Sequence, residues 1–520
     1  MKTLRLLPAF LLCAFAFVSI PSCVSESESH AANDIPKRLQ MCDLLSDHAV
    51  LQRSAATHVW GRGTPFAKVK VRIGDEGWFA KSATAETTAA EDGTWLACVD
   101  VRKLGDGPYT MTVTCGGEKL TREDILIGEV FLASGQSNME KPLGPRTNQQ
   151  PIPDYMEIAK ASALQPNAVR MATIREKQVP MPVDTFSGAW ELPGETTTPK
   201  YSAVAYFAAV AYFAAEQLHK ELGVPIGVIH SSLGGSKVQV WTSREALVAG
   251  GEDPNETFRG KTSTYLYNGM VYPLRNASFR SVLWFQGEQN MDDAEKYDKL
   301  YALMTDSWRK LFQRDDLQFF FVTLNGYKPP DPDPNAVAVQ PRIRASQQRT
   351  EIADPLSHMA VGADTGEALD VHARDKRPIG ERLAKLVLKY EFGRDIVADS
   401  PVFKSASRNG SEVTVVFDRV GSGLVAHPVK TEYVTQGRRA NAKYTRCSPD
   451  AELEDFALRD ADGNWHWADD AHIVGRDSVV VSSKAVPAPA AIRYAYRGFP
   501  MGNLYNEEGF PAAQFDVELK

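Results

Sequence analysis

Three hydrophobic patterns follow one another along the chain of 520 residues. Between Leu39 and Ile127, short β-branched and aromatic runs alternate with polar positions and are separated by turn dipeptides such as Asp92-Gly93. Alternation with a period of two, broken at short intervals by turns, is typical of sheets with one buried face. Residues 38–127 are therefore predicted to form an N-terminal β-sandwich.

Residues 128–398 show a different pattern, in which apolar runs of strand length alternate with stretches of helical periodicity. Strands are expected at 129–134, 225–230, 281–285, 317–324 and 359–362, and helices at 202–222, 297–312, 344–352 and 378–390. Repeated β-α-β units place parallel strands side by side and cover both faces of the sheet with helices. This region is predicted to be a three-layer α/β/α domain.

The period-two pattern returns after residue 398, with strands expected at 411–417, 477–481 and 491–496. Residues 399–520 are therefore predicted to form a C-terminal β-rich domain. The predicted fold class is α/β, with the three-layer domain flanked by one β-rich domain on each side in the sequence.

Residues 1–23 have the composition of a signal peptide. Lys2 and Arg5 precede an apolar stretch over residues 6–20, which is too short to span a bilayer comfortably. Cys23 and the polar run after it resemble a bacterial lipoprotein signal, and ordinary cleavage near this position is the alternative. We expect an exported protein, which is periplasmic, extracellular or an outer-membrane lipoprotein attached to the membrane through lipidated Cys23.

Charge and cysteine content narrow the classes of partner. The formal net charge of −7 argues against a nucleic-acid partner. The sequence contains neither Cys-x-x-Cys nor His-Glu-x-x-His, so we expect no metal and no cofactor. Export permits disulfides, and Cys98 and Cys115 are expected either to face each other on neighbouring strands or to be free buried thiols.

Chemically useful residues follow four of the predicted parallel strands. They are Ser137 after the first strand, Gly234 and Gly235 after the second, the segment 286–290 after the third, and Asp364, Asp370 and His372 after the fifth. Ligand sites of open parallel sheets gather beyond the carboxyl ends of the strands. A hydroxyl, an imidazole, carboxylates and amide donors at one edge are the groups that acyl transfer needs.

Three sequence blocks around these residues resemble the sialate O-acetylesterase family of SGNH hydrolases. The blocks are Gly-Gln-Ser-Asn-Met-Glu from residue 135, Leu-Gly-Gly-Ser from residue 233 and Trp-Phe-Gln-Gly-Glu-Gln-Asn from residue 284. Phrases at 128–130, 267–270 and 503–506 are also similar to that family. The resemblance implies an SGNH-type hydrolase domain that removes O-acetyl groups from a sugar or glycan, without a cofactor.

The resemblance also implies roles for individual residues. Ser137 is the expected nucleophile, and its own N–H is one oxyanion donor. The second donor is Gly235 or Gly234, and the third is an amide side chain, with Asn290 favoured and Gln286 as the alternative. His372 is the expected general base and then general acid, while Glu288 is either a supporting or a buried structural acid.

The acid that orients His372 is less clearly marked. Many relatives space it as Asp-x-x-His, whereas Asp370 lies two residues before His372, and side chains at i and i+2 diverge on an extended segment. A bent loop is needed to bring them together; Asp364 is the alternative, and a Ser-His dyad supported by a backbone carbonyl is the third option. Lys237-Val238-Gln239 also departs from the family pattern, which commonly has a hydrophobic residue and Glu there.

Several substrates and one non-enzymatic function fit these features. The ester could be carried by sialic acid or by xylan, pectin or another polysaccharide. A glycan-binding surface lipoprotein with a relict hydrolase core is the rival from another class. The intact Ser137, Asn290 and His372 favour the esterase.

Overall fold

A single long strand, β8 (Glu118–Gly135), belongs both to the N-terminal strands and to the central sheet. The computed structural model describes residues 38–75, 81–146, 151–194, 203–428 and 452–519. Along β8 the side chains first alternate in exposure and are then continuously buried from Ile125 onward. A continuously buried run is typical of a strand that is covered on both faces. The boundary expected between residues 127 and 128 therefore falls inside one strand.

The second half of β8 is the middle strand of a mainly parallel sheet. On one side of it lie β11 (Ile226–Ser232) and β9 (Val169–Thr173), with the short antiparallel β10 (Trp190–Glu191) at the edge; on the other side lie β14 (Val282–Phe285), β15 (Phe319–Val322) and β16 (Ser357–Ala360). Ser134 of β8 is in register with Ser231 of β11 and Trp284 of β14. The carboxyl ends of these three strands therefore meet at one edge.

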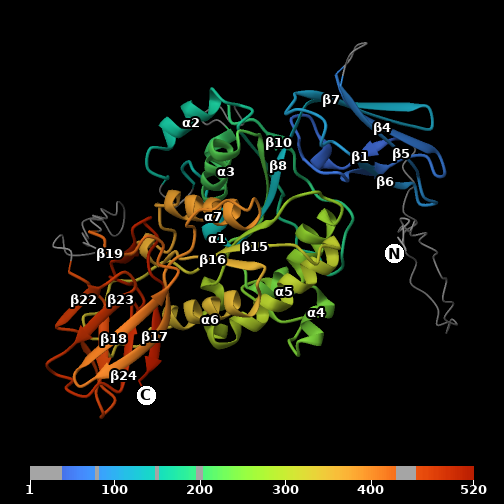
Figure 1. Ribbon diagram of the computed structural model, residues 1–520. Helices are drawn as coiled ribbons and strands as arrows, with labels where there is room; N and C mark the ends of the chain where they lie inside the picture. The colour runs from blue at the N-terminus through green and yellow to red at the C-terminus, as the bar shows by residue number, and fades with distance from the viewer. Residues whose placement is uncertain (1–37, 76–80, 147–150, 195–202, 429–451, 520) are drawn as a thin grey trace, which may run out of the picture. The chain divides into compact units, whose positions relative to one another are not determined.

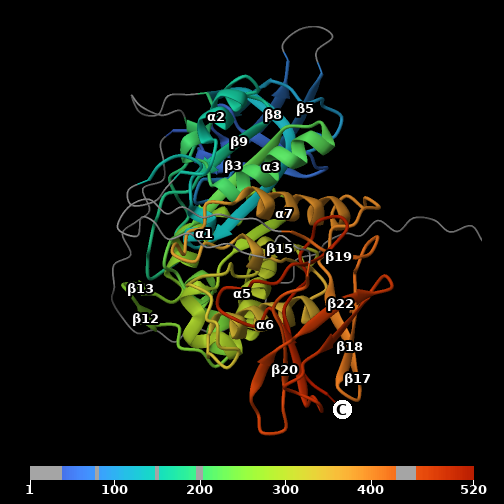
Figure 2. The ribbon, with the colours of Figure 1, turned by 90° about the vertical axis from the view of Figure 1, so that its left-hand side faces the viewer.

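Helices cover both faces of this sheet. In both ribbon views α3 (Ala209–Leu222) and α7 (Arg377–Tyr390) lie on one side of β15, and α5 (Tyr297–Phe312) and α6 (Gln340–Ala353) lie on the other (Figures 1 and 2). Successive side chains of each strand point to opposite faces. Leu283 and Phe320 accordingly belong to the core with α3 and α7, whereas Trp284 and Phe321 belong to the core with α5.

Most elements of this region lie within a few residues of the predicted ones. The helix at 297–312 has the predicted bounds. The helix expected over 202–222 begins only at Ala209, because residues 203–206 form a separate 3₁₀ turn, η2 (Ala203–Tyr206). The shorter helices α1 (Ser137–Glu140), α2 (Tyr155–Ala163) and α4 (Arg244–Ala249) lie in the connecting segments.

Most of the N-terminal strands form antiparallel pairs around a shared apolar core, whereas β2 (Val50–Gln52) pairs in parallel with β8. Their bounds are β1 (Gln40–Met41), β2 (Val50–Gln52), β3 (Thr57–Arg62), β4 (Lys68–Gly74), β5 (Ser82–Thr88), β6 (Thr94–Val99) and β7 (Tyr109–Cys115). Cys98 is exposed on β6, which pairs with β3, while Cys115 is buried on β7, which pairs with β4 and β8. Both are free thiols, so the cross-strand disulfide does not form.

Among the described residues after 398, the strands form two four-stranded antiparallel sheets and one further pair. One sheet contains β17 (Val402–Asn409), β18 (Glu412–Asp418), β23 (Ser478–Ser482) and β22 (Asp470–Val474); the other contains β21 (Trp465–Trp467), β20 (Phe456–Arg459), β24 (Ala491–Tyr494) and β26 (Phe515–Glu518); the pair is β19 (Leu424–Ala426) with β25 (Leu504–Asn506). Alternate side chains from both sheets, including Val415, Val479, Leu458 and Ile492, share one core. This region is β-rich, in agreement with its period-two pattern.

Residues 36–520 belong to one compact unit, which includes all the described residues. The leader over residues 1–23, with the proposed lipidation site Cys23, lies outside the described residues. Within the part of the chain that the structure describes, no helix combines the length and the apolar character that crossing a membrane requires.

Candidate active site

Ser137 lies where the middle strand of the sheet turns into a helix. β8 ends at Gly135, and α1 begins at Ser137. Gly135 has a φ of +136°, and a Cβ there would lie 2.2 Å from the carbonyl oxygen of Phe285, so only glycine fits this close approach. Asn138 and Met139 are buried, whereas Ser137 is half-exposed. The turn thus presents one serine at the carboxyl edge of the sheet.

The two glycines after β11 lie beside this turn but differ in the use of their N–H groups. A Cβ on Gly234 would lie 3.3 Å from the Cβ of Ser137, and the Gly234 N–H donates to Oε2 of Glu140 at 2.7 Å. Gly235 has a φ of +67°, and no described residue accepts a hydrogen bond from its N–H. Gly235, not Gly234, therefore has the N–H that could donate to a bound oxyanion.

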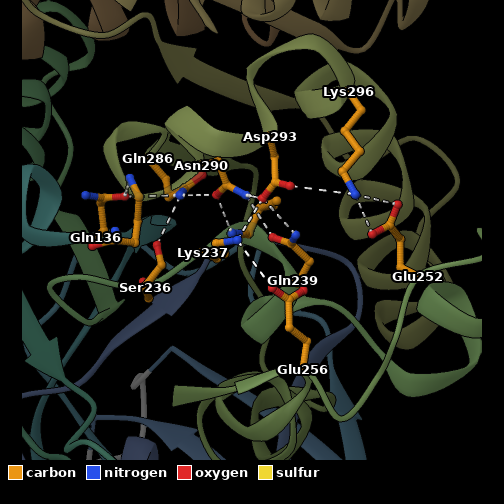
Figure 3. Close-up of polar contacts among 12 residues, drawn as sticks. Gln136, Ser236, Lys237, Gln239, Glu252, Glu256, Gln286, Asn290, Asp293 and Lys296 are labelled. Atoms are coloured by element: carbon orange, nitrogen blue, oxygen red, sulfur yellow. Dashed lines mark hydrogen bonds and ion pairs between the residues drawn. The ribbon is translucent and has the colours of Figure 1, made fainter. Parts of the chain in front are cut away.

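The amides of Gln286 and Asn290 are buried and fully used in hydrogen bonds within the protein (Figure 3). Nδ2 of Asn290 donates to Gln239 and Asp293 at 2.8 and 3.1 Å, and its Oδ1 accepts from the Val238 N–H at 2.9 Å. Nε2 of Gln286 donates to Oδ1 of Asn290 at 2.7 Å, to the Ser236 carbonyl and to Gln136. The structure therefore does not bring either amide to Ser137 as the expected third donor.

The unusual Lys237-Val238-Gln239 segment explains why Asn290 is engaged. Nζ of Lys237 lies 3.0 Å from Asp293 and 3.4 Å from Glu256, while Gln239 accepts from Asn290 (Figure 3). Burial alone lowers the pKa of Lys237, but its contacts with Asp293 and Glu256 outweigh this effect and raise it. The departure from the family pattern thus builds a polar network that holds the segment after β14.

Gln289 is the half-exposed amide of the segment 286–290. It lies in the 3₁₀ turn η6 (Glu288–Lys296), after Glu288, whose Oε2 is enclosed, and before the buried Asn290. A Cβ on Gly235 would lie 3.7 Å from Oε1 of Gln289 and 3.8 Å from Nζ of Lys261. The sequence did not predict Gln289 as a donor. The available signal was the departure of residues 237–239 from the family pattern, because Val238 and Gln239 form hydrogen bonds with the Asn290 amide.

His372 lies in a bent loop between β16 and α7, and Asp370 contacts it twice. Oδ1 of Asp370 accepts from the backbone N–H of His372 at 2.8 Å and lies 3.8 Å from its Nδ1. Burial lowers the pKa of His372, and Lys376 and Lys141 lower it further, whereas Asp370 and Glu140 act in the opposite direction. The bend in the loop allows the i, i+2 pair to approach, which an extended segment would prevent.

Asp364 is engaged elsewhere, in a buried ion pair. Both of its oxygens accept from the guanidinium of Arg382 at 2.6 Å, and Tyr505 donates to it at 3.0 Å. Arg382 also donates to the Val361 carbonyl at 2.7 Å. A bidentate pair of this kind locks both groups in place, so Asp364 joins α7 to the end of β16 and to β25.

The expected Ser-His-Asp arrangement predicts that Asp370→Asn lowers kcat on p-nitrophenyl acetate by ~10²-fold, because in that arrangement the carboxylate stabilises the imidazolium in the transition state. The fold should be retained, since Asp370 is partly exposed. Steady-state kinetics with circular dichroism would check this. A kcat within about twofold of the wild type would instead favour a Ser-His dyad.

A second serine-histidine contact lies close by, on β11. Oγ of Ser232 lies 2.5 Å from Nε2 of His230, and Nδ1 of His230 is buried without a hydrogen-bond partner among the described residues. Burial lowers the pKa of His230 to about 4. An imidazole that weakly basic, with no carboxylate to orient it, is a poor general base. Ser137 and His372 therefore stay the expected nucleophile and base.

One edge of the sheet thus gathers most of the residues expected to act together. Ser137 contacts the glycine turn, and the Asn138 amide donates to the carbonyl of Val371, next to His372, at 3.1 Å. Asp370, Gly235 and Gln289 complete this group. The remaining candidates are engaged elsewhere: Gly234 with Glu140, Asn290 with the segment 237–239, Gln286 with Asn290 and Ser236, and Asp364 with Arg382.

Comparison with known proteins identifies relatives for most of the chain. A family model described as carbohydrate esterase, sialic acid-specific acetylesterase matches residues 127–389. A solved carbohydrate acetylesterase from Xanthomonas citri is 31% identical, with a TM-score of 0.76, and the match covers 92% of this chain and 99% of that one. Its mixed α/β fold is the fold found here.

Curated relatives agree over a shorter stretch. The sialate O-acetylesterase of Homo sapiens is 30% identical over 287 residues, which cover 52% of this chain and 53% of the relative. The sialate O-acetylesterase of Mus musculus is 27% identical over 333 residues, covering 54% and 59%. The chain spans about half the length of the curated relatives it matches. With a family model that matches half of its residues and a solved relative aligned over nearly all of it, the chain belongs to the carbohydrate esterase family of sialic acid-specific acetylesterases.

Proposed function

We propose that this protein hydrolyses O-acetyl esters of carbohydrates through an acetyl-enzyme on Ser137. The observation that supports this most directly is the meeting of three loops at the carboxyl ends of β8, β11 and β14. They bring the half-exposed Ser137, the unengaged N–H of Gly235 and the amide of Gln289 to one edge of the sheet. The loop of His372 is hydrogen-bonded to the same turn.

In the first half-reaction, Oγ of Ser137 attacks the acetyl carbonyl carbon while Nε2 of His372 takes the hydroxyl proton. The negative charge on the carbonyl oxygen is stabilised by the N–H groups of Ser137 and Gly235 and by the amide of Gln289. His372 then returns its proton to the sugar oxygen as the ester bond breaks. The sugar departs with a free hydroxyl group, and the acetyl group remains on Oγ of Ser137 as an ester.

The second half-reaction repeats these steps with water as the nucleophile. His372 takes a proton from water, the resulting hydroxide attacks the acetyl-enzyme, and the same donors stabilise the second oxyanion. The imidazolium then protonates Oγ of Ser137 as acetate leaves. Asp370 lies 3.8 Å from Nδ1 of His372 and stabilises the positive imidazolium in both halves of the cycle.

Gln289→Ala is expected to lower kcat by ~10²-fold, because one preorganised donor to the developing oxyanion is lost. Asn290→Ala provides the contrast: it removes contacts to Gln239, Asp293 and Val238, so it should first lower the free energy of unfolding. Steady-state kinetics and urea unfolding of both variants separate the two roles. An unchanged kcat in Gln289→Ala would contradict this role and would again favour Asn290 or Gln286 as the third oxyanion donor.

The pH dependence of kcat/KM follows from the pKa of His372, which burial and nearby ammonium groups hold below 6.5. A general base acts as neutral imidazole, so activity falls as pH drops through this pKa. The acid limb should therefore have its midpoint below that of an ordinary histidine. Asp370→Asn should move it lower still, because the carboxylate that raises the pKa is gone. A midpoint above the ordinary histidine value would contradict this.

Substrate choice is best tested by acetate release from a panel of O-acetylated sialic acids, acetylated xylan and acetylated pectin. The family description favours sialic acid esters, whereas the Xanthomonas citri relative is described only as a carbohydrate acetylesterase. The preferred substrate is the one for which the wild type has the highest kcat/KM and from which Ser137→Ala releases no acetate. Binding of these glycans without acetate release would instead support a relict, glycan-binding protein.

The finer architecture and the location of the protein are also proposals. We infer that the central sheet with its two helical layers is an SGNH-type hydrolase domain, predicted over 128–398, and the helices on both faces of the sheet support this (Figure 1). The flanking domains predicted at 38–127 and 399–520 stay proposals, with β8 shared between the first of them and the central sheet. Export, and membrane attachment through Cys23, rest on the sequence of the leader. Fractionation of cells expressing the wild type and Cys23→Ala would test the attachment.

A further inference from the structure

The side chain of Asn138, the residue after Ser137, uses all of its hydrogen-bonding groups and is 1% exposed. Its Nδ2 donates to the carbonyl oxygen of Val371 at 3.1 Å and to Oε1 of Glu288. Its Oδ1 accepts from Nζ of Lys376 at 2.6 Å. One amide thus connects the nucleophile turn with the segment after β14, with the middle of the loop before α7 and with the last residue of that loop.

The bond to Val371 matters because the next residue is His372. The loop from Gly366 to Lys376 contains no helix and no named strand, and its backbone forms isolated bridges at Glu367, with Tyr327 and with Asp370. Side-chain contacts therefore help to determine the path of its second half. Asp370 and Glu367 anchor it internally, through the N–H groups of His372 and Arg374. Asn138 contacts it from the nucleophile turn, one residue from Ser137 and one residue from His372.

The partners of Asn138 explain why an amide is needed at this position. Lys376 is fully buried, and burial lowers its pKa to about 7. Burial raises the pKa of Glu288, and its Oε2 is enclosed without a hydrogen-bond partner among the described residues. The amide offers an oxygen to the ammonium group and two N–H donors to Glu288 and Val371. An aspartate could accept from Lys376 but could donate to neither of the others.

We propose that Asn138 is a positioning residue that holds the His372 loop at the correct distance from Ser137 for proton transfer. This inference rests on the proposed function, because it explains what holds the proposed base, His372, near the proposed nucleophile, Ser137. Displacement of a catalytic group by about 1 Å can cost ~10²-fold in rate. The loss should appear in kcat, because Asn138 is buried and its hydrogen bonds go to the enzyme's own loops.

The test uses Asn138→Asp, which keeps the shape and the acceptor for Lys376 but removes both donors. On p-nitrophenyl acetate, kcat should fall by ~10²-fold while KM stays within about twofold. Asn503→Asp is the matched control, because Asn503 is also fully buried and its Nδ2 donates to a backbone carbonyl, that of Glu452, at 2.7 Å. Asn503→Asp should leave kcat unchanged, and thermal unfolding of both variants compares their stability.

A double-mutant cycle with His372→Ala decides whether Asn138 acts through the base. If it does, Asn138→Asp costs less than about twofold once His372 is gone, because the two effects are then not additive. An equal ~10²-fold loss in both backgrounds would overturn the proposal, as would an unchanged kcat in the single variant. Should Asn138→Asp fail to fold, Asn138→Ala is carried through the same cycle. Wild-type protein without Ser137-dependent acetate release would refute the proposed function before any Asn138 variant is measured.

Discussion

Ser137→Ala is expected to lower acetate release by at least ~10³-fold, with little change in stability, because the variant has no hydroxyl to form the acetyl-enzyme. Ser137 is half-exposed at the end of the middle strand, and its Oγ makes no hydrogen bond among the described residues that the substitution would remove. The measurement is kcat/KM on p-nitrophenyl acetate and on the best glycan substrate.

The matched control for this experiment is Ser232→Ala. Ser232 also touches a histidine, at 2.5 Å, but burial lowers the pKa of that imidazole, His230, to about 4. Ser232→Ala should therefore retain activity within about threefold, since a weak base without an orienting acid cannot activate its hydroxyl. A serine-directed organophosphonate should label the wild type and Ser232→Ala but not Ser137→Ala. Loss of labelling in Ser232→Ala, with labelling kept in Ser137→Ala, would identify Ser232 on β11 as the nucleophile instead.

Asp364→Ala is expected to lower the free energy of unfolding by about 3–5 kcal/mol, because it leaves the buried guanidinium of Arg382 without its counter-charge. The side chains of Asp364 and Arg382 are only 11% and 9% exposed, and both oxygens of the carboxylate accept from the guanidinium. Tyr505 would also lose an acceptor. Urea unfolding followed by tryptophan fluorescence would measure the change.

Asp316→Ala is the control, because the ion pair of Asp316 with Arg314 is exposed and should contribute less than about 1 kcal/mol. The folded fraction of Asp364→Ala should keep a kcat close to that of the wild type, in contrast to Asp370→Asn. The reverse result, an unchanged stability with a kcat lowered ~10²-fold, would make Asp364 the acid that orients His372.

The elements of the α/β region could be predicted because their patterns are local. A stripe of apolar residues at helical spacing predicted the helix at 297–312 with its observed bounds, and the buried strands were continuous apolar runs. The start of α3 could not be predicted in this way. Residues 203–206 are as apolar as the helix itself, and the break into a separate 3₁₀ turn depends on contacts with other segments.

The division at residue 127 shows a second limit of local patterns. The change from alternating to continuous burial near Ile125 is visible in the sequence, but it reports a change of surroundings, not an end of the strand. β8 continues from the N-terminal strands into the central sheet because its backbone pairs first with β7 and then with β11 and β14. Hydrogen-bond partners of this kind lie far apart in the sequence.

By itself, the sequence determined which residue types stand at the ends of the strands, and therefore the chemistry that we propose: Ser137, the glycine turn and His372. The choice between similar neighbours depended on tertiary contacts. Gly235 differs from Gly234 because Glu140 occupies one N–H, and Gln289 differs from Asn290 because Lys237, Gln239 and Asp293 form a network around the latter. Asp370 approaches His372, while Asp364 is held by Arg382, because a hydrogen-bonding group can serve only the partners that the folded chain brings within about 3 Å.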